Sequence, residues 1–179
     1  LIDAGQTHSI AVDSDGYVWT WGEGTNGRLG DGGTVDHHVP VKVVGGEMGT
    51  TYLSNIYPVT VATDGTSYAV DSSGYVWAWG NGSKGQLGNG SNSDSLTPVQ
   101  VHAGEQNPTP GAYLANIIWI SAGSSYVMAM DSVGNVYAWG SNRYGVLGDG
   151  TTTNRNEPVK VKNSDGTGFL SNINWICAG

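Results

Sequence analysis

The stretch Gly16–Gly22 (GYVWTWG) decides the fold of this chain, because it occurs three times. The second copy is Gly74–Gly80 (GYVWAWG) and the third is Gly134–Gly140 (GNVYAWG). The copies start 58 and then 60 residues apart, and an aspartate stands three residues before the first glycine of each. Self-similarity at a fixed spacing is the signature of a repeat architecture, so the whole chain is interpreted as a repeat array.

Further motifs recur around each copy in the same order. Leu-Gly-x-Gly follows at 29–32, 87–90 and 147–150, and Pro-Val-x-Val follows at 40–43, 98–101 and 158–161. An aromatic-Leu-x-Asn-Ile segment then occupies 52–56, 113–117 and 169–173. We expect repeat units at approximately 1–59, 60–119 and 120–175, with 176–179 starting a fourth, as in a piece of a longer array.

Each unit contains four short extended stretches separated by turn residues. Val, Ile, Trp, Tyr and Thr dominate these stretches, and such residues favour β-strands. Asp13–Gly16 and its two counterparts have the composition of a tight hairpin turn, with the glycine free to adopt a positive φ. The pattern predicts an all-β chain of three four-stranded antiparallel blades, forming a partial β-propeller or half of a dimeric ring.

The tryptophans are expected to form the core between blades. Trp19, Trp21, Trp77, Trp79 and Trp139 recur in register, which favours packing of one blade against the next. Trp119 and Trp175 precede the first-strand motif and are predicted to be core residues as well. Cys177 lies inside that motif and is expected to be a small buried apolar group.

Composition excludes several classes of protein. Seven Lys and Arg stand against 15 Asp and Glu, giving a net charge of −8, which disfavours nucleic-acid binding. Charged residues form 12% of the chain, against about 25% in a typical soluble domain, and 29 residues are glycine. No apolar run reaches ~18 residues, so membrane insertion is not expected.

Three motifs that suggest chemistry have structural explanations. The spacing G-x-G-x-x-G at 22–27 and 80–85 matches a dinucleotide fingerprint, but Leu-Gly-x-Gly follows it where a helix is required. Asp13-x-Asp15-Gly16 resembles the start of a calcium loop without the later ligands. His37 and His38 are adjacent, so they point apart on an extended chain. We therefore predict a non-catalytic protein with no cofactor and no metal site, in which His8 is a packed structural histidine.

Within a unit the motifs follow one another in a fixed order: Ala-Gly-x-x-His-Ser-x-Ala-x-Asp, Gly-x-Val-Trp-x-Trp-Gly, Gly-x-Leu-Gly and Pro-x-x-Val. This order resembles the regulator of chromosome condensation repeat family, in a bacterial-type form. The resemblance covers essentially the whole chain, three times over. It implies a seven-bladed closed ring in most members. It also implies diverse uses, since some members exchange nucleotide on a small GTPase and bind chromatin, and a bacterial relative inhibits β-lactamase.

A propeller blade places the loops after its first and third strands on the same face, and loops on a rigid scaffold often carry function. Tyr144 and Arg143 are the favoured anchors there, because Tyr and Arg are enriched at interface hot spots. The predicted partner-binding residues are Glu23, Asn26, Arg28, Asn81, Lys84, Asn142, Arg143 and Tyr144.

The leading hypothesis is a non-catalytic scaffold that binds another protein, of unknown identity, through this face. The alternative is a carbohydrate-binding or cell-surface adhesion module, and guanine-nucleotide exchange is a weaker candidate. A homodimer that completes the ring is a further hypothesis. Scarce Lys with abundant Asn, Ser, Thr and Gly favours an exported bacterial protein, at the cell surface or outside the cell.

Overall fold

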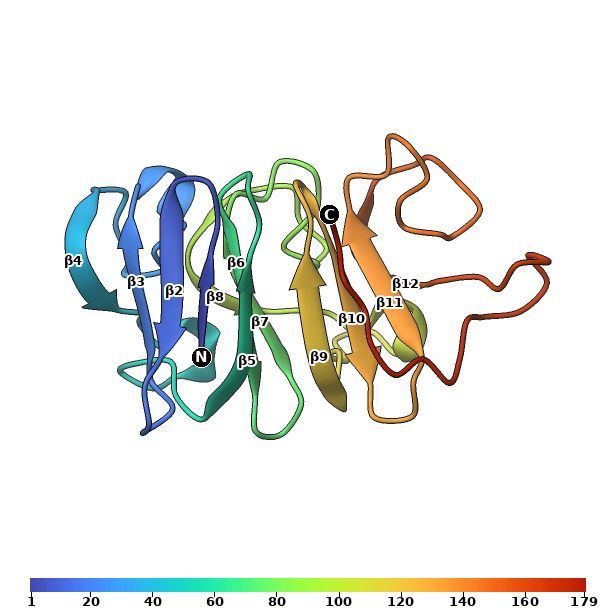
Figure 1. Ribbon diagram of the computed structural model, residues 1–179, viewed down its shortest axis with the longest axis horizontal. Coiled ribbons are helices and arrows are strands. Elements are labelled where there is room, and N and C mark those ends of the chain that lie inside the picture. Colours follow the sequence, from blue (N-terminus) through green and yellow to red (C-terminus); the bar gives the residue numbers. More distant parts are fainter.

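A computed structural model describes all residues of the chain, 1–179, and contains three four-stranded antiparallel sheets side by side (Figure 1). The first sheet consists of β1 (Ile2–Ala4), β2 (His8–Val12), β3 (Val18–Gly22) and β4 (His37–Lys42). The second consists of β5 (Ile56–Val61), β6 (Thr66–Asp71), β7 (Val76–Gly80) and β8 (Ser95–Gln100). The third consists of β9 (Ile117–Ala122), β10 (Tyr126–Asp131), β11 (Val136–Gly140) and β12 (Arg155–Lys160).

Helical structure is limited to three single turns of 3-10 type. They are η1 (Thr25–Gly27), η2 (Gly46–Met48) and η3 (Gly104–Gln106). None of them approaches the length that a membrane-crossing helix requires. The predicted all-β architecture of four-stranded antiparallel blades is confirmed.

Within each sheet the strands follow chain order, so each strand pairs with the next. The first strands β1, β5 and β9 are neighbours along one side of the row of sheets. The loops that follow the first and third strands of each sheet lie at the top of Figure 1, and we call this side of the molecule the upper face. These loops comprise residues 5–7, 23–36, 62–65, 81–94, 123–125 and 141–154. The lower face carries the hairpins between second and third strands.

The repeated aspartate closes each lower hairpin. Asp13 Oδ1 accepts hydrogen bonds from the backbone N–H groups of Asp15 and Tyr17, at 3.0 and 2.9 Å. Its Oδ2 accepts one from the indole of Trp19 at 2.8 Å. Gly16 completes the turn with φ +78°, a conformation that favours glycine. The predicted hairpin turn is therefore confirmed, and both carboxylate oxygens of Asp13 are engaged within it.

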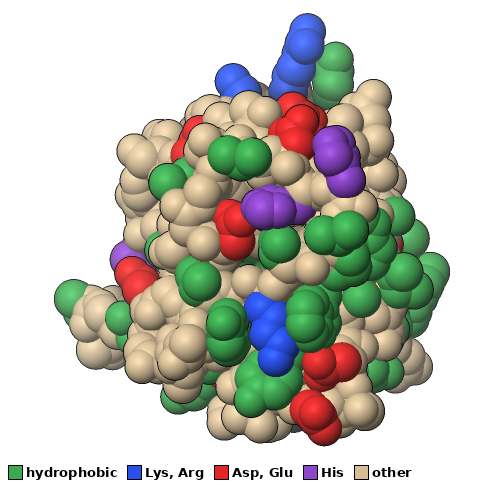
Figure 2. All heavy atoms as spheres, turned by 90° about the vertical axis from the view of Figure 1, so that its left-hand side faces the viewer, with side chains coloured by type: hydrophobic (Ala, Val, Ile, Leu, Met, Phe, Trp, Pro, Cys, Tyr) green, Lys and Arg blue, Asp and Glu red, His purple; other side chains and the backbone are tan.

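The outer face of the first sheet, which points away from the second sheet, is open to solvent. Figure 2 views this side of the molecule and shows hydrophobic side chains gathered around charged ones. Trp19 and Trp21 project on this face and are only half-buried. Lys42 covers part of it, with Nζ 3.9 Å from the ring centre of Tyr17 and 5.2 Å from that of Tyr52. This face differs from its counterparts in the second and third sheets, which are covered.

The seam between the first and second sheets is an apolar interface with one shared polar acceptor. Ile10 and Val18 of the first sheet pack with Trp77 and Trp79 of the second. The backbone carbonyl of Arg28 accepts hydrogen bonds from Trp79 Nε1 at 3.0 Å and from Ser67 Oγ at 2.9 Å. The tryptophan thus both fills the seam and fixes its register.

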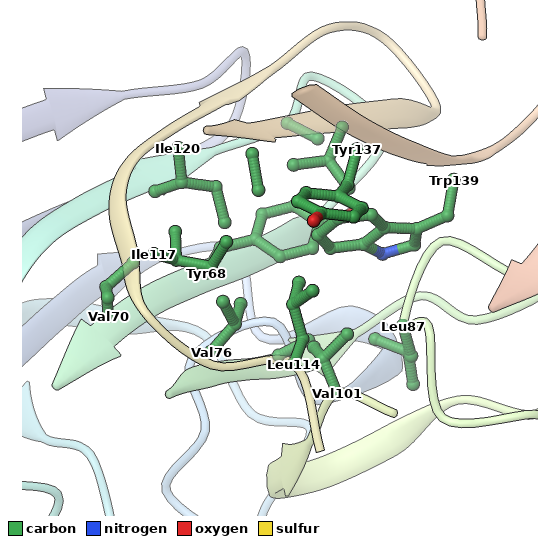
Figure 3. Packing of buried hydrophobic residues seen from close by; sticks show 14 residues of the cluster. Tyr68, Val70, Val76, Leu87, Val101, Leu114, Ile117, Ile120, Tyr137 and Trp139 are labelled. Atoms are coloured by element: carbon green, nitrogen blue, oxygen red, sulfur yellow. The ribbon is translucent and has the colours of Figure 1, made fainter. Parts of the chain in front are cut away.

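The seam between the second and third sheets repeats this design (Figure 3). The ring of Tyr68 meets Trp139 edge-on, with centroids 6.5 Å apart and planes at 79°. The carbonyl of Gln86 accepts from Trp139 Nε1 and from the Tyr68 hydroxyl, each at 2.9 Å. Aliphatic side chains complete the cluster, including Leu87 and Leu114. The prediction that Trp77, Trp79 and Trp139 form the core between blades is confirmed, whereas Trp19 and Trp21 lie on the uncovered face.

Three further predicted core residues are not in the core. Trp119 is 37% exposed, Trp175 is 65% exposed and Cys177 is exposed. Side chains alternate along a strand, so when Ile120 turns into the seam, Trp119 turns away from it. Trp119, Trp175 and Cys177 instead line a largely apolar groove of about 230 Å³ beside the first strands.

The linkers after β4 and β8 attach each sheet to the outer strand of the next. Glu47 Oε2 accepts the backbone N–H of Gln100 at 2.8 Å, and Glu105 Oε2 accepts that of Lys160 at 2.8 Å. Gly46 precedes Glu47 with φ +53°, and a Cβ there would stand 2.1 Å from the carbonyl oxygen of Pro98. A larger residue would therefore break this attachment.

The linker after β12 lacks these features. The isolated bridges Val44–Tyr52 and Lys162–Phe169 align the first and third linkers, and this alignment places Ser164 at the position of Gly46. Ser164 does not adopt a positive φ. Asp165 stands where Glu47 does but accepts hydrogen bonds from its own neighbour Thr167. The third linker is therefore folded onto itself.

Candidate functional site

The upper-face loops are tied together in the same way in all three sheets. In each sheet, the residue after the third strand donates its N–H to a carbonyl in the loop after the first strand. The pairs are Glu23 to Thr7 at 2.9 Å, Asn81 to Gly65 at 3.2 Å and Ser141 to Ser125 at 2.8 Å. The next N–H is bound by a side chain twelve residues later, in the pairs Gly24 with Asp36, Gly82 with Asp94 and Asn142 with Asn154. The loops therefore have a common rigid base.

Arg28 is buried in the first seam rather than displayed on the surface. Its guanidinium donates to Glu23 Oε2 at 2.6 Å, to the Thr7 hydroxyl and to the Thr25 carbonyl. Hydrogen bonds from the hydroxyls of Thr7 and Thr25 lower the pKa of Glu23, and the charge of Arg28 lowers it further. Glu23 and Arg28, both predicted to bind a partner, thus form an internal ion pair with a structural role.

Gln86 occupies the position of Arg28 in the second seam. Its Nε2 donates to Asp64 Oδ2 at 2.7 Å, and its Oε1 accepts the backbone N–H of Lys84 at 2.7 Å. Burial raises the pKa of Asp64, against the opposing effect of hydrogen bonds from Ser125, Gln86 and Thr66. Each seam therefore carries its own buried polar cluster beneath the upper face.

Asn142, another predicted partner-binding residue, is fully buried. Its Nδ2 donates to Asp149 Oδ1 and to the carbonyls of Thr151 and Thr153, each at 3.1 Å. Its Oδ1 accepts the N–H of Leu147. The side-chain amide of Asn142 is buried and its hydrogen bonds are made within the loop at 141–154. The structure therefore corrects the expectation that Asn142 contacts a partner.

The remaining predicted residues lie nearer the surface. Asn81 is half-buried and donates to the carbonyl of Asp64 at 3.3 Å. Lys84 and Arg143 are exposed, and Tyr144 is 79% exposed with the Arg143 guanidinium 5.1 Å from its ring centre. Asn26 reaches the second sheet, where its Nδ2 donates to Asp94 Oδ2 at 2.5 Å.

The loop tips lie over the seams and not over the centre of each sheet. Asn26 contacts the sheet that follows its own, and the loop at Lys84 packs beside the third sheet, where a Cβ on Gly85 would stand 2.6 Å from Asn156 Cα. Sequence reasoning missed Asp94, Asn154 and Asn156, the residues that meet these tips. Asp94 and Asn154 are 60 residues apart, which is the spacing of the second and third repeats, and this spacing was the signal that could have found them.

The lower face contains two equivalent hollows, one of about 440 Å³ and one of about 270 Å³. The larger is lined by Asp71, Ser72 and Ser73, and the smaller by Asp131 and Ser132. The carboxylate of Asp71 is occupied by the N–H groups of its own turn and the Trp77 indole. The rest of the lining offers a ligand serine hydroxyls, the Asn116 side chain and the apolar side chains of Ile117 and Ile118.

The histidines do not converge on one site. His8 is buried, with Nε2 2.9 Å from Ser67 Oγ across the first seam, so the predicted structural role is confirmed. His37 Nε2 lies 2.9 Å from Asp31 Oδ2, whereas the adjacent His38 is exposed. No three His, Cys, Asp or Glu side chains are grouped so that they could hold a metal ion.

Comparison with known sequences identifies relatives of the whole chain. It is 32% identical over 179 residues to the ultraviolet-B receptor UVR8 of Arabidopsis thaliana, covering 100% of this chain and 37% of that protein. It is 31% identical over 168 residues to the E3 ubiquitin-protein ligase HERC2 of Mus musculus, covering 92% of this chain and 3% of HERC2. The chain therefore spans only a part of these relatives.

Solved structures share the fold at low sequence identity. Human WBSCR16 superposes with a TM-score of 0.73 at 20% identity, covering 92% of this chain and 39% of that one. Prp20p of Saccharomyces cerevisiae superposes with a TM-score of 0.67 at 18% identity, covering 91% of this chain and 38% of that one. These relatives come from animals, a plant and yeast, so the expectation of a bacterial, extracellular protein has no support among them.

A family model matches most of the chain in three consecutive segments. The model describes the regulator of chromosome condensation (RCC1) repeat, and the segments are residues 15–65, 73–130 and 133–179. A second model of the same repeat matches residues 1–28 and 117–146. With the tryptophan seams and the three four-stranded sheets, these matches show that the chain belongs to the RCC1 repeat family.

Proposed function

We propose that the chain is a non-catalytic protein-interaction module and that its upper face receives the partner. One observation carries this proposal. The backbone ties beneath the upper-face loops repeat in all three sheets, whereas the exposed loop residues, among them Thr25, Lys84 and Tyr144, differ between sheets. A rigid base with variable exposed side chains suits recognition of another protein.

Structural relatives support a binding role. Prp20p of Saccharomyces cerevisiae has binding properties to Gsp1p and histones, and yeast RCC1 (Prp20) has been crystallised bound to Kap60. The net charge of −8 argues against direct binding of nucleic acid by this chain. We therefore assign it a protein partner, with the identity left to experiment.

The test compares three immobilised proteins in extracts of the source organism: the wild type, an upper-face variant and a lower-face variant. The upper-face variant carries Lys84→Ala, Arg143→Ala and Tyr144→Ala. The control carries Asp15→Ala, Ser73→Ala and Val133→Ala, all exposed on the lower face. A captured protein is then purified and its affinity measured by calorimetry.

We expect the upper-face variant to weaken binding at least ~10-fold while the lower-face variant binds like the wild type, because the removed side chains are anchor types. Binding that survives the upper-face changes, or that is lost equally in the lower-face variant, would contradict the proposal. Circular dichroism and thermal unfolding establish that all three proteins are folded.

Carbohydrate binding is the alternative, favoured by the ring of Tyr144, which is 79% exposed and available for stacking. A glycan array separates the two functions: a glycan signal that Tyr144→Ala abolishes supports the alternative. Guanine-nucleotide exchange remains a weaker candidate, and release of a fluorescent guanine nucleotide from a small GTPase tests it directly.

The homodimer that completes a ring is a separate proposal. The uncovered outer face of the first sheet supports it, since that face repeats the tryptophan positions of the covered ones. The third linker weighs against a standard seam there, because Ser164 replaces the required glycine. Light scattering over a concentration series tests the proposal, with a mass that stays at that of one chain as the contrary result.

A further inference from the structure

A carboxylate bridges the first seam at the upper face. Asp94 belongs to the second sheet, and its Oδ1 accepts the backbone N–H of Gly82 at 2.9 Å. Its Oδ2 accepts Asn26 Nδ2, from the first sheet, at 2.5 Å. Asn26, the donor that reaches across this seam, is thus bound by a carboxylate of the same chain.

The second seam has the same geometry with the charges changed. Asn154 replaces Asp94, and its Oδ1 accepts the backbone N–H of Asn142 at 2.8 Å. This hydrogen bond fixes the orientation of the amide, so the free end of Asn154 is its NH₂ group, a donor. Lys84 replaces Asn26 on the loop that crosses the seam. Two donors, one of them a cation, therefore stand where the first seam has a donor and a carboxylate.

A hollow of about 180 Å³ opens at this place. It is lined only by polar residues: Ser83, Lys84, Asn92, Asn154 and Asn156. Lys84 takes part in no ion pair of the structure, and the side chain of Asn92 makes no hydrogen bond within it. Asn156 Nδ2 is used by the carbonyl of Gly90 at 2.8 Å. The residues that line the hollow thus carry a free ammonium, free amide NH₂ groups and a hydroxyl, and none of them is acidic.

The neighbouring carboxylates are committed to other groups. Glu157 accepts His102 Nδ1 at 2.8 Å, and Glu105 accepts the backbone N–H of Lys160 at 2.8 Å. Asp149 pairs with Arg155 at 2.6 Å. None of the three lines the hollow, so none supplies the acceptor that its donors lack.

We propose that this hollow binds a carboxylate, and that its natural occupant is an Asp or Glu side chain of the partner protein. This inference rests on the proposed function, because Lys84 belongs to the upper-face set. It adds the chemistry of one contact. In the second seam the ammonium of Lys84 and the amide of Asn154 bind an acidic side chain of the partner, whereas in the first seam Asp94 of the chain itself supplies the carboxylate.

The test uses acetate as the probe and therefore needs no partner. Side-chain amide NMR signals of Asn154 and Asn92 are followed in the whole chain as sodium acetate is added, at ionic strength held constant with sodium chloride. We expect a saturable shift of the Asn154 signal with acetate and no shift with acetamide, which has the same shape without the charge.

Two variants sharpen the result. Asn154→Asp restores the carboxylate found at Asp94, so it should occupy the hollow itself and weaken acetate binding at least tenfold. Lys84→Gln removes the charge while keeping a polar chain and should do the same. Gln6→Glu, which adds one negative charge at an exposed position outside the hollow, is the matched control for net charge and should bind acetate like the wild type.

An absent shift, a shift equalled by acetamide, or undiminished acetate binding in Asn154→Asp would overturn the inference. The proposed function fails separately, when a partner captured by the wild type is also bound fully by the upper-face variant. A partner lost by that variant together with an unresponsive hollow would refute only the carboxylate contact.

Discussion

The indole Nε1 of Trp79 donates a hydrogen bond to the backbone carbonyl of Arg28 at 3.0 Å, although 51 residues separate them. Trp139 and Gln86 repeat this relationship at 2.9 Å across the next seam. The acceptor is a backbone carbonyl in both cases, so this hydrogen bond does not depend on which side chain the acceptor residue carries. This explains how an arginine and a glutamine occupy equivalent positions in one fold.

Replacing Trp79 with Phe should destabilise the chain by about 2–4 kcal/mol, since it removes a buried hydrogen bond and leaves a small cavity. Trp21→Phe is the matched control, because Trp21 occupies the same position on the uncovered first sheet. The control should cost less than about 1 kcal/mol. Urea unfolding followed by circular dichroism measures both, and equal losses in the two variants would contradict the seam role of Trp79.

Gly65→Ala should lower stability by more than about 2 kcal/mol. Gly65 has φ +92°, and a Cβ there would stand 2.6 Å from Arg28 Cζ. Gly32→Ala isolates the backbone contribution, because Gly32 has φ +89° and no atom within 4 Å of its added Cβ. Thermal unfolding of the two variants should therefore differ by the cost of displacing Arg28, and identical melting temperatures would argue against that contact.

Stability should decrease as the pH falls from about 6.5 towards 4. Burial lowers the pKa of His8 to about 4, and the charge of Arg28 adds to the effect. An unfolded histidine titrates near ~6.5, so in this window the unfolded chain binds a proton that the folded chain does not. The loss contributed by His8 should reach roughly 3 kcal/mol and level off below the folded pKa.

His8→Gln provides the comparison for this pH dependence, because carboxylates also titrate in the same range. Urea unfolding of both proteins at pH 7, 5.5 and 4.5 should give curves that converge as the pH falls, since only the wild type carries the titrating imidazole. Parallel curves over the whole range would show that His8 does not contribute.

Asn142→Ala should act on stability and not selectively on binding. It removes a buried amide that holds four backbone or side-chain partners of the 141–154 loop, which should cost about 2–4 kcal/mol. Tyr144→Ala, two residues away and exposed, should change stability by no more than about 0.5 kcal/mol. Hydrogen exchange of the loop amides distinguishes them: protection should drop in Asn142→Ala alone.

The framework was predictable because local sequence determines it. Gly16 requires a hairpin turn and Trp79 recurs at a strand position, so strands and turns followed from the repeat itself. Trp119 shows where this reasoning stops, since its neighbours Ile120 and Ile118 gave no indication of which face would be covered. Exposure there depends on how sheets pack, which is a property of the assembled seams.

The candidate site was less accessible to sequence reasoning. Arg28 and Asn142 have residue types common at interfaces, yet both are buried, because hydrogen bonds within the loops consume their polar groups. Asn26 and Asp94 meet across 68 residues, a contact that no local pattern encodes. Lys84 was predicted from its place in the loop after the third strand, and the amides that accompany it emerged only from the structure.

The third linker, with Ser164 in place of the close-packed glycine and Asp165 bonded to its own neighbour, means that the three units are not interchangeable modules. Exchange of the first and second units preserves every linker glycine, whereas moving the third unit inward would place a serine against the next sheet. Only a linker that keeps this glycine can pack as closely against the outer strand of a following sheet as the first and second linkers do, so an exchange of units that preserves the glycine should preserve the attachment.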